Sequence, residues 1–437
     1  MIIVYKFGGA SVKGADEIKN VANILEKIPP HTKCIAVFSA MGKTTNRLEA
    51  ILKTFPQTDH LHKLTQYHEK IIDELYTDEK EKAAAYMKLQ ALLQELHTEL
   101  TSNFTNDKDE FYDRIIPFGE RISTCIISQY LNIAGIINTE LDARRVIITD
   151  NTFRSANVNW QKTENAINIA TTELFKTTDI IVTQGFTGMS ETQKPVTLGR
   201  EGSDYSAAIF AHALDAEHVT IWKDVPGVLN ADPKYFSDAV KIPFISYWDA
   251  TELAYYGASV IHPKTIKPLQ NKNIPLFVRS FLNHEQDGTR VMNAAQNPSY
   301  NTEKKIPSYI FKPNQILISI SPRDFSFIEE DNLSYIFKTF SEHHIHINMM
   351  QNSALSFSVC IDADKGDFTA VRIALQQQYK VKYNEGITIV TVRHYTEKTL
   401  LDILKGKEIL LEQKSRYTAQ FAVIDPEITT IEHQPLE

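Results

Sequence analysis

The stretch that decides the fold is Gly199-Arg200-Glu201-Gly202-Ser203-Asp204-Tyr205-Ser206-Ala207-Ala208. It follows a predicted strand, Ile180-Ile181-Val182-Thr183, and opens into a helical run from Tyr205 to Leu214. The free N–H groups at a helix start favour an anion, and the guanidinium of Arg200 fits a carboxylate or phosphate with two hydrogen bonds. Gly202 allows a ligand to approach the backbone closely. The plainer interpretation is that Ser203 or Asp204 is a simple N-cap. The rest of the chain must therefore show whether this stretch is an anion-binding site or an ordinary helix start.

Size and composition narrow the class of protein. A chain of 437 residues holds two domains or three, and 43% hydrophobic with 23% charged residues is ordinary for a globular protein. The net charge of −8 argues against general nucleic-acid binding and against an anionic membrane surface. No apolar run is long enough to span a bilayer, and residues 2–5 are too short for a secretory signal. Three scattered cysteines favour free thiols, so we expect a cytoplasmic protein.

Two glycine-bearing loops follow predicted strands near the N-terminus. Residues 2–5 run into Lys6-Phe7-Gly8-Gly9-Ala10-Ser11, and a helix is predicted from about 16 to 27. Residues 34–38 run into Ser39-Ala40-Met41-Gly42-Lys43-Thr44-Thr45-Asn46, again before a helix. Neither loop is a P-loop or a dinucleotide fingerprint. Open α/β sheets bind ligands at the carboxyl ends of their strands, so the two loops together predict a phosphate-cradling site.

The remaining segments complete the predicted architecture. Leucines at helical spacing between 60 and 104 predict an inserted helical hairpin, and Glu120 begins a helix where it either complements the dipole or holds an ammonium group. His262, followed by proline, is interpreted as structural. Residues 283–312 are polar and predict a linker. Beyond them a β-α-β-β-α-β pattern over 315–383 and a shorter β-α-β-β copy over 387–424 predict a duplication of α+β units.

Four motifs now carry a specific resemblance. Residues 6–12 resemble the K-F-G-G-T-S-V opening of aspartate kinases in the amino-acid-kinase family, and 199–204 resembles their G-R-G-G-S-D. Residues 222–232 are similar to W-T-D-V-P-G…D-P, 257–263 to G-A-K-V-L-H-P, and the C-terminal duplication to a pair of ACT modules. The resemblance implies a three-layer α/β kinase domain with helices on both sheet faces over 1–282, with an insert at about 60–112. It also implies a linker at 283–312 and tandem ACT-like, ferredoxin-like units at 313–437.

The resemblance also implies an activity and its residues. We expect ATP-dependent phosphorylation of the β-carboxylate of L-aspartate to 4-phospho-L-aspartate with Mg²⁺, the first step towards lysine, threonine and methionine. The implied catalytic residues are Lys6, which stabilises the transferring phosphoryl group, and Asp204, which orients Lys6. The implied aspartate-binding residues are Ser39, Thr45, Glu120, Arg200, Gly202 and Ser203. The implied nucleotide-binding residues are Lys6, Gly8, Gly9, Ser11, Lys223, Asp224, Leu229, Asp232, Lys234, Ser259 and Val260. The implied effector residues are Phe325 and Asn348, and we expect no protein-only metal site.

The chain departs from the family pattern at positions that concern the nucleotide more than aspartate. Glu201 replaces a glycine in the anion-binding loop, Ser259 a lysine, Leu229 a tyrosine and Lys234 an arginine. A carboxylate at 201 repels phosphate unless it turns outward or pairs with a cation. Two alternatives therefore stay open, a kinase for a related acidic amino acid such as glutamate and a non-catalytic ACT-type amino-acid sensor. We expect a homodimer with lysine or threonine as effector, and neither nucleic acid nor membrane as partner.

Overall fold

The computed structural model describes residues 1–102, 107–236, 238–258, 261–297, 305–324 and 326–425. The chain forms two compact units. The N-terminal unit comprises the described residues of Met1–Val228, Lys241–Thr251 and Ser259–Asn301. The C-terminal unit comprises the described residues of Leu229–Val240, Glu252–Ala258 and Thr302–Glu437. Each unit has its own sheet, so each is described by itself.

An eight-stranded sheet forms the centre of the N-terminal unit, in the order β3-β5-β2-β1-β8-β10-β11-β9. The first five of these strands and β10 run parallel, and β11 is antiparallel to β10. Their side chains are buried on both faces, as continuous apolar runs in parallel strands predict. The strand bounds are β1 (Ile2–Phe7), β2 (Lys33–Phe38), β3 (Asn138–Leu141), β5 (Ile180–Gln184), β8 (His218–Lys223), β9 (Phe244–Ser246), β10 (Leu276–Ser280) and β11 (Thr289–Met292).

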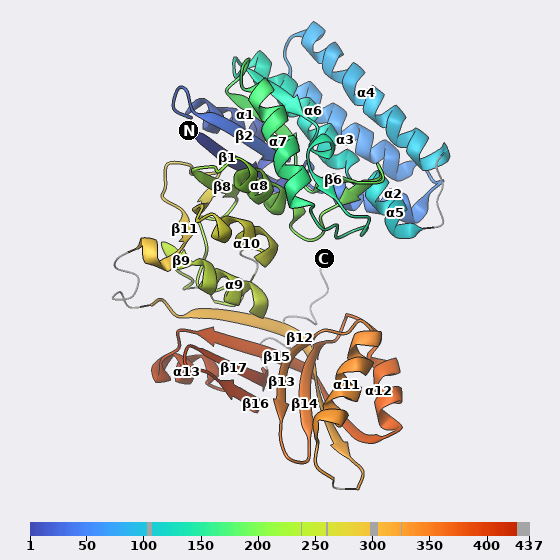
Figure 1. Cartoon of the computed structure of the whole chain (residues 1–437), viewed down its shortest axis with the longest axis vertical. Coiled ribbons are helices and arrows are strands. Elements are labelled where there is room, and N and C mark those ends of the chain that lie inside the picture. The colour runs from blue at the N-terminus through green and yellow to red at the C-terminus, as the bar shows by residue number, and fades with distance from the viewer. Residues whose placement is uncertain (103–106, 237, 259–260, 298–304, 325, 426–437) are drawn as a thin grey trace. The chain divides into compact units, whose positions relative to one another are not determined.

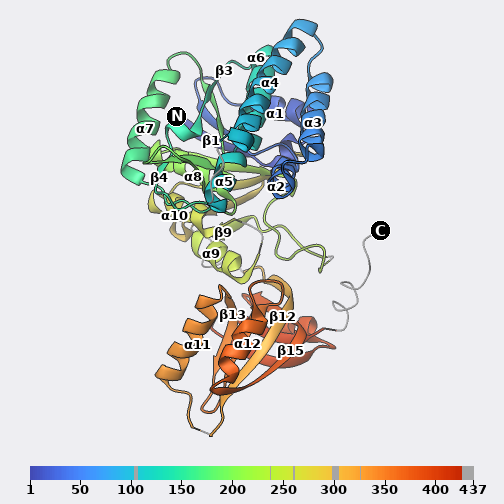
Figure 2. The same ribbon diagram turned by 90° about the vertical axis from the view of Figure 1, so that its right-hand side faces the viewer.

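Helices cover both faces of this sheet, which confirms the predicted three-layer arrangement (Figures 1 and 2). One face carries α1 (Ala15–Glu26), α2 (Thr44–Thr54), α3 (Asp59–Leu75), α4 (Glu79–Ser102), α5 (Lys108–Ile115) and α6 (Phe118–Ile133). The other carries α7 (Trp160–Leu174), α8 (Gly202–Ala213) and α10 (Pro263–Asn271), and α9 (Tyr247–Tyr256) precedes α10. A small sheet has the order β4-β6-β7, from β4 (Ile148–Thr149), β6 (Thr187–Ser190) and β7 (Pro195–Thr197). No described helix is both long and apolar enough to cross a membrane.

The predicted helical hairpin is present as α3 and α4. Its leucines and isoleucines, including Leu64, Ile71 and Leu96, join the same core cluster as Phe7 of β1 and Ile18 of α1. The insert is therefore part of the core of the N-terminal unit and not a separate domain. The helix that follows the hairpin, α5, brings Tyr112 to the site described below.

The C-terminal unit is one six-stranded antiparallel sheet in the order β13-β14-β12-β15-β17-β16. Its elements are β12 (Ser308–Pro322), α11 (Glu330–Glu342), β13 (Ile347–Asn352), β14 (Phe357–Asp362), α12 (Phe368–Gln376), β15 (Tyr379–Arg393), α13 (Glu397–Leu404), β16 (Glu408–Lys414) and β17 (Thr418–Ile424). The predicted tandem α+β architecture is confirmed, and β12 and β15 run through both modules of the tandem.

The segment predicted as a linker, 283–312, contains two strands that the sequence did not indicate. Residues 289–292 form β11 in the main sheet, and 308–312 begin β12. Ser308–Lys312 pairs with Ile389–Arg393, so the second module takes its fourth strand from before the first module. β11 is short, and both it and residues 308–312 are flanked by asparagine, lysine or proline, so the local sequence did not indicate a strand at either place. The sequence also predicted that one module ends at residue 383 and the next begins at 387. This prediction was wrong, because β15 is continuous from Tyr379 to Arg393.

Candidate active site

A cavity of about 530 Å³ opens where the loops after β1, β2 and β8 meet the start of α8. A Cβ at Gly9 would lie 2.8 Å from the Ala40 carbonyl oxygen, so the first two loops can approach this closely only with glycine there. The lining residues are Lys6, Gly9, Ser39, Ala40, Gly42, Thr45, Tyr112, Glu120, Arg154, Phe186, Thr197, Gly199, Arg200, Glu201, Gly202, Ser203, Asp204 and Lys223.

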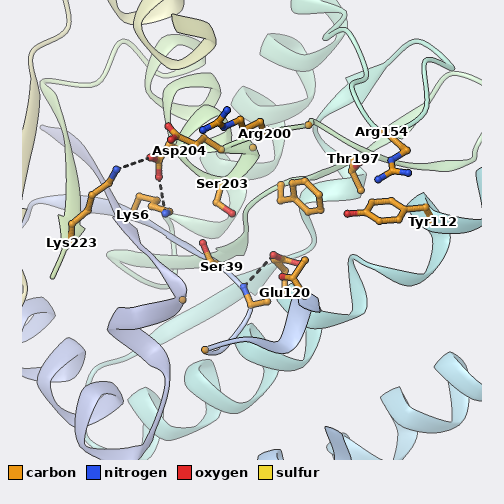
Figure 3. Close-up of a pocket in the computed structure, with 18 residues that line it drawn as sticks. Lys6, Ser39, Tyr112, Glu120, Arg154, Thr197, Arg200, Ser203, Asp204 and Lys223 are labelled. Carbon is orange, nitrogen blue, oxygen red and sulfur yellow. Dashed lines mark hydrogen bonds and ion pairs between the residues drawn. The ribbon is translucent and has the colours of Figure 1, made fainter. Parts of the chain in front are cut away.

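Both predicted catalytic residues and all six predicted aspartate-binding residues line this single cavity. Lys6 Nζ lies 2.7 Å from Asp204 Oδ1, and Lys223 Nζ lies 3.7 Å from Asp204 Oδ2 (Figure 3). Lys6 comes from the end of β1, Lys223 from the end of β8, and Asp204 from the first turn of α8. Burial acts to raise the pKa of Asp204, but the charges of the two lysines outweigh it and that pKa is lowered. The three groups therefore form a charged cluster with a fixed carboxylate.

Glu120 supplies a second buried carboxyl group, whose pKa is shifted in the opposite direction from that of Asp204. It is 3% exposed and lies in the first turn of α6, where Oε1 accepts the Ala40 N–H at 3.2 Å. Oε2 is buried and has no hydrogen-bond partner among the described residues. Burial raises the pKa of Glu120 to about 8, against the weaker opposing effects of the Ala40 N–H and the Lys6 charge. A buried acceptor without a partner is costly, so this group is suited to a cationic ligand.

The N-cap of α8 is Glu201, not Ser203 or Asp204, and the Glu201 side chain makes no capping hydrogen bond to the helix. Glu201 adopts a left-handed conformation with φ 53°, which explains why glycine suits this position. Its Oε2 accepts the His262 N–H at 2.9 Å, so the carboxylate is held by a backbone donor. The neighbouring Arg200 is exposed and lines the cavity. His262 is the N-cap of α10 and accepts the Lys264 N–H, which confirms its structural interpretation.

One wall of the cavity was not predicted from the sequence. Tyr112, Arg154, Phe186 and Thr197 all line it, and the Arg154 guanidinium lies 4.0 Å from the centroid of the Tyr112 ring. Figure 3 shows Tyr112 and Arg154 on the opposite side from Lys6 and Lys223, with Ser203 and Glu120 between them. These residues lie in a short helix, an irregular loop and a three-residue strand. No motif marks them, and only the tertiary fold brings them together.

The predicted nucleotide-binding residues are more scattered. Lys6, Gly9 and Lys223 line the cavity, and Gly8 precedes the 3₁₀ turn Gly9–Val12. Ser11 is fully buried and donates to the Trp222 carbonyl at 3.3 Å. Asp224 is exposed and lies outside the cavity lining. The other predicted nucleotide contacts stay predictions: Leu229, Asp232 and Lys234 belong to the C-terminal unit, and Ser259 and Val260 lie outside the described residues.

The predicted effector residues lie in the C-terminal unit. Phe325 is outside the described residues. Asn348 is in β13, where its Oδ1 accepts from Lys312 Nζ at 2.6 Å. Its Nδ2 donates to Gln315 Oε1 at 2.8 Å and to Asp362 Oδ1 at 3.0 Å. Asn348 is thus part of a polar cluster within this unit.

The fold and the cavity define a class of protein, and comparison with known sequences agrees. Residues 1–280 match the model of the amino acid kinase family, and the chain belongs to that family. Its relatives include aspartokinase 1, chloroplastic, of Arabidopsis thaliana, which is 29% identical over 83% of this chain and 63% of the relative. They also include the lysine-sensitive aspartokinase 3 of Escherichia coli, 27% identical over 90% and 86%. The resemblance to aspartate kinases inferred from the motifs is therefore confirmed.

A solved structure extends the likeness to the whole described fold. The crystal structure of E. coli aspartokinase III in complex with aspartate and ADP superposes with a TM-score of 0.81, covering 99% of this chain and 98% of that one. The two are 24% identical, so this likeness concerns the fold. The chain spans less than two thirds of the length of the Arabidopsis relative.

Proposed function

We propose that this protein is an aspartate kinase, which transfers the γ-phosphoryl group of ATP to the β-carboxylate of L-aspartate. The products are 4-phospho-L-aspartate and ADP. The observation that carries the proposal is the single cavity that combines the Lys6–Asp204 ion pair with the buried, unpartnered Oε2 of Glu120. The aspartokinase relatives supply the identity of the acceptor.

The chemistry needs positioning and cations more than proton transfer. A carboxylate nucleophile is already ionised at neutral pH, so the reaction needs no general base to activate it. Lys6 stabilises negative charge on the equatorial oxygens of the transferring group, and Asp204 holds its ammonium in place at 2.7 Å. Glu120 receives the α-ammonium of aspartate, and Arg200 clamps a carboxylate of the same substrate.

The cavity also fits Mg²⁺ that arrives with ATP. No group of three or more His, Cys, Asp or Glu residues able to hold a metal occurs within the described ranges. Mg²⁺ in phosphotransferases is usually bound by one or two carboxylates together with substrate phosphates, and Asp204 is the carboxylate nearest to Lys6. The bound ion would supply positive charge on the phosphate oxygens.

The proposal is tested by acyl-phosphate formation. Purified protein with ATP and Mg²⁺ is incubated with aspartate, glutamate or no acceptor, and hydroxylamine traps the acyl phosphate while ADP is measured. We expect hydroxamate and ADP in equal amounts with aspartate alone. A product only with glutamate would identify a kinase for the related amino acid. If the protein binds aspartate but forms no acyl phosphate with any acceptor, it is the non-catalytic sensor and the proposal is refuted.

We further propose that the enzyme catalyses the first step towards lysine, threonine and methionine, acts as a homodimer and binds an amino-acid effector in its C-terminal unit. Lysine is the first candidate and threonine the second. If the effector's ammonium uses Asn348, it must compete with Lys312, which already donates to that side chain. Lys312→Met is therefore expected to tighten lysine binding in calorimetry several-fold. No binding of lysine or threonine by either protein would contradict a regulatory role.

A further inference from the structure

A buried carboxylate lies behind the wall of the cavity that the sequence did not predict. Asp113 is in α5 and is 0% exposed. Its Oδ2 accepts the Arg154 N–H at 2.8 Å and the Thr197 N–H at 2.9 Å. Its Oδ1 accepts the Thr197 hydroxyl at 2.7 Å. One side chain of the helical insert therefore holds two segments that are distant in the sequence.

Both segments line the cavity, whereas Asp113 does not. Thr197 ends β7, and the loop that follows it carries Arg200 and leads into α8, whose first turn holds Ser203. Arg154 has a left-handed backbone, with φ 64°, which a residue other than glycine keeps only where its surroundings hold it. The Ala156 N–H also donates to the Thr197 carbonyl at 3.0 Å, so the two segments are joined directly as well.

We propose that Asp113 is the positioning residue for the aspartate end of this cavity, acting through Thr197 and Arg154. This rests on the proposed aspartate kinase activity. The ion pair of Lys6 with Asp204 lies on the other side of the cavity (Figure 3). Loss of Asp113 therefore disturbs the aspartate site more than the phosphoryl site.

The hydrogen bonds identify a conservative replacement. In Asp113→Asn the amide oxygen still accepts both backbone N–H groups, and the amide nitrogen donates to Thr197 if the hydroxyl turns to accept. Asp113→Ala leaves all three donors without their acceptor. Thr197→Val keeps the shape of the side chain but removes the hydroxyl. In the double variant Asp113→Asn with Thr197→Val, the amide N–H groups face a methyl group and lose their acceptor.

The test measures KM for aspartate, KM for ATP and kcat for the wild type and these four variants. We expect Asp113→Ala to raise KM for aspartate about 10- to 100-fold, the size of effect that follows when a group that orients metal ligands is lost. KM for ATP should change less than threefold. Asp113→Asn should restore nearly wild-type values, and the double variant should lose more than the product of its two single effects.

A matched control separates positioning from general stability. Asn138 is also buried and bonds Ser128 and the Ile136 carbonyl, but it does not line or support the cavity. Asn138→Ala should lower the melting temperature without changing KM for aspartate. If Asp113→Ala fails to fold, the KM values of Asp113→Asn, Thr197→Val and their double variant still test the inference. An additive double variant, or equal increases in both KM values, would overturn the inference. A wild type without acyl-phosphate formation would instead overturn the proposed function.

Discussion

If Glu120 receives the ammonium group of aspartate, as proposed, its buried carboxyl group should make aspartate binding depend on pH. Its pKa is raised from 4.5 to about 8 because the side chain is buried, and Oε2 has no partner among the described residues. An ammonium ligand favours the carboxylate over the neutral acid. Binding of aspartate below pH 8 must therefore release the proton that the free enzyme holds on Glu120.

The size of the effect follows from this pKa. With a pKa of about 8, only about one tenth of Glu120 is ionised at pH 7 and about one hundredth at pH 6. If aspartate binds only the ionised form, its KM falls about tenfold from pH 6 to pH 7 and levels off above about pH 8. The stability of the protein without aspartate changes with pH in the opposite direction. Because the pKa of Glu120 in the folded state lies above 4.5, the folded state holds a proton that the unfolded state has lost. The free energy of unfolding therefore falls by about 1.4 kcal/mol per pH unit between roughly pH 4.5 and 8.

Calorimetry and kinetics check the prediction about aspartate binding. Titration with aspartate in buffers of different ionisation enthalpy should show about 0.9 proton released per site at pH 7 and almost none at pH 9. Glu120→Gln keeps an oxygen for the Ala40 N–H but cannot ionise. It should weaken aspartate binding about 10- to 100-fold, as for a lost hydrogen bond to a charge, and remove the pH dependence. A KM for aspartate that stays flat from pH 6 to 8 in the wild type would refute the reasoning.

Three substitutions test the other charged groups. Lys6→Ala should lower kcat about 10²- to 10³-fold in a folded protein, because one preorganised cation is lost; near-normal turnover in steady-state assays would exclude the assigned role. Arg200→Lys should raise KM for aspartate more than KM for ATP, because an ammonium cannot form the two-bond contact; the reverse pattern would assign Arg200 to phosphate. Glu201→Gly removes the bond to His262 but relieves a left-handed residue, so we expect kcat within about threefold and a stability change of about 1 kcal/mol. A large fall in kcat would instead assign Glu201 a catalytic contact.

The parts of the structure that local pattern determines were predictable. Strands β1, β2, β5 and β8 are apolar runs bounded by glycine-bearing loops, and their carboxyl ends must meet at one edge of a parallel sheet. Lys6 lies at the carboxyl end of β1, and Glu120 and Asp204 lie in the first turns of α6 and α8. Their meeting in one cavity is therefore a consequence of the order of elements along the chain.

The other wall of the cavity depends on contacts that no local pattern records. Arg154 lies in the loop between β4 and α7, and its stacking on Tyr112 requires α5 to pack beside that loop. The fourth strand of the second ACT-like module shows the same limit, because residues 308–312 pair with a strand about 80 residues further along. Long-range pairing of this kind is invisible to periodicity within a short window.

Glu201 shows how a departure from a family pattern can be tolerated. The backbone at this position is left-handed, a conformation that costs a residue with a side chain about 1–2 kcal/mol relative to glycine. The carboxylate accepts the His262 N–H at the start of α10, and a hydrogen bond to a charged group is worth about 1.5–3 kcal/mol. The bond thus offsets the strain. It also holds the negative charge with a backbone donor, which reduces its repulsion of an anion at Arg200. An acidic side chain in the anion-binding loop is therefore compatible with the site, because here it joins that loop to α10.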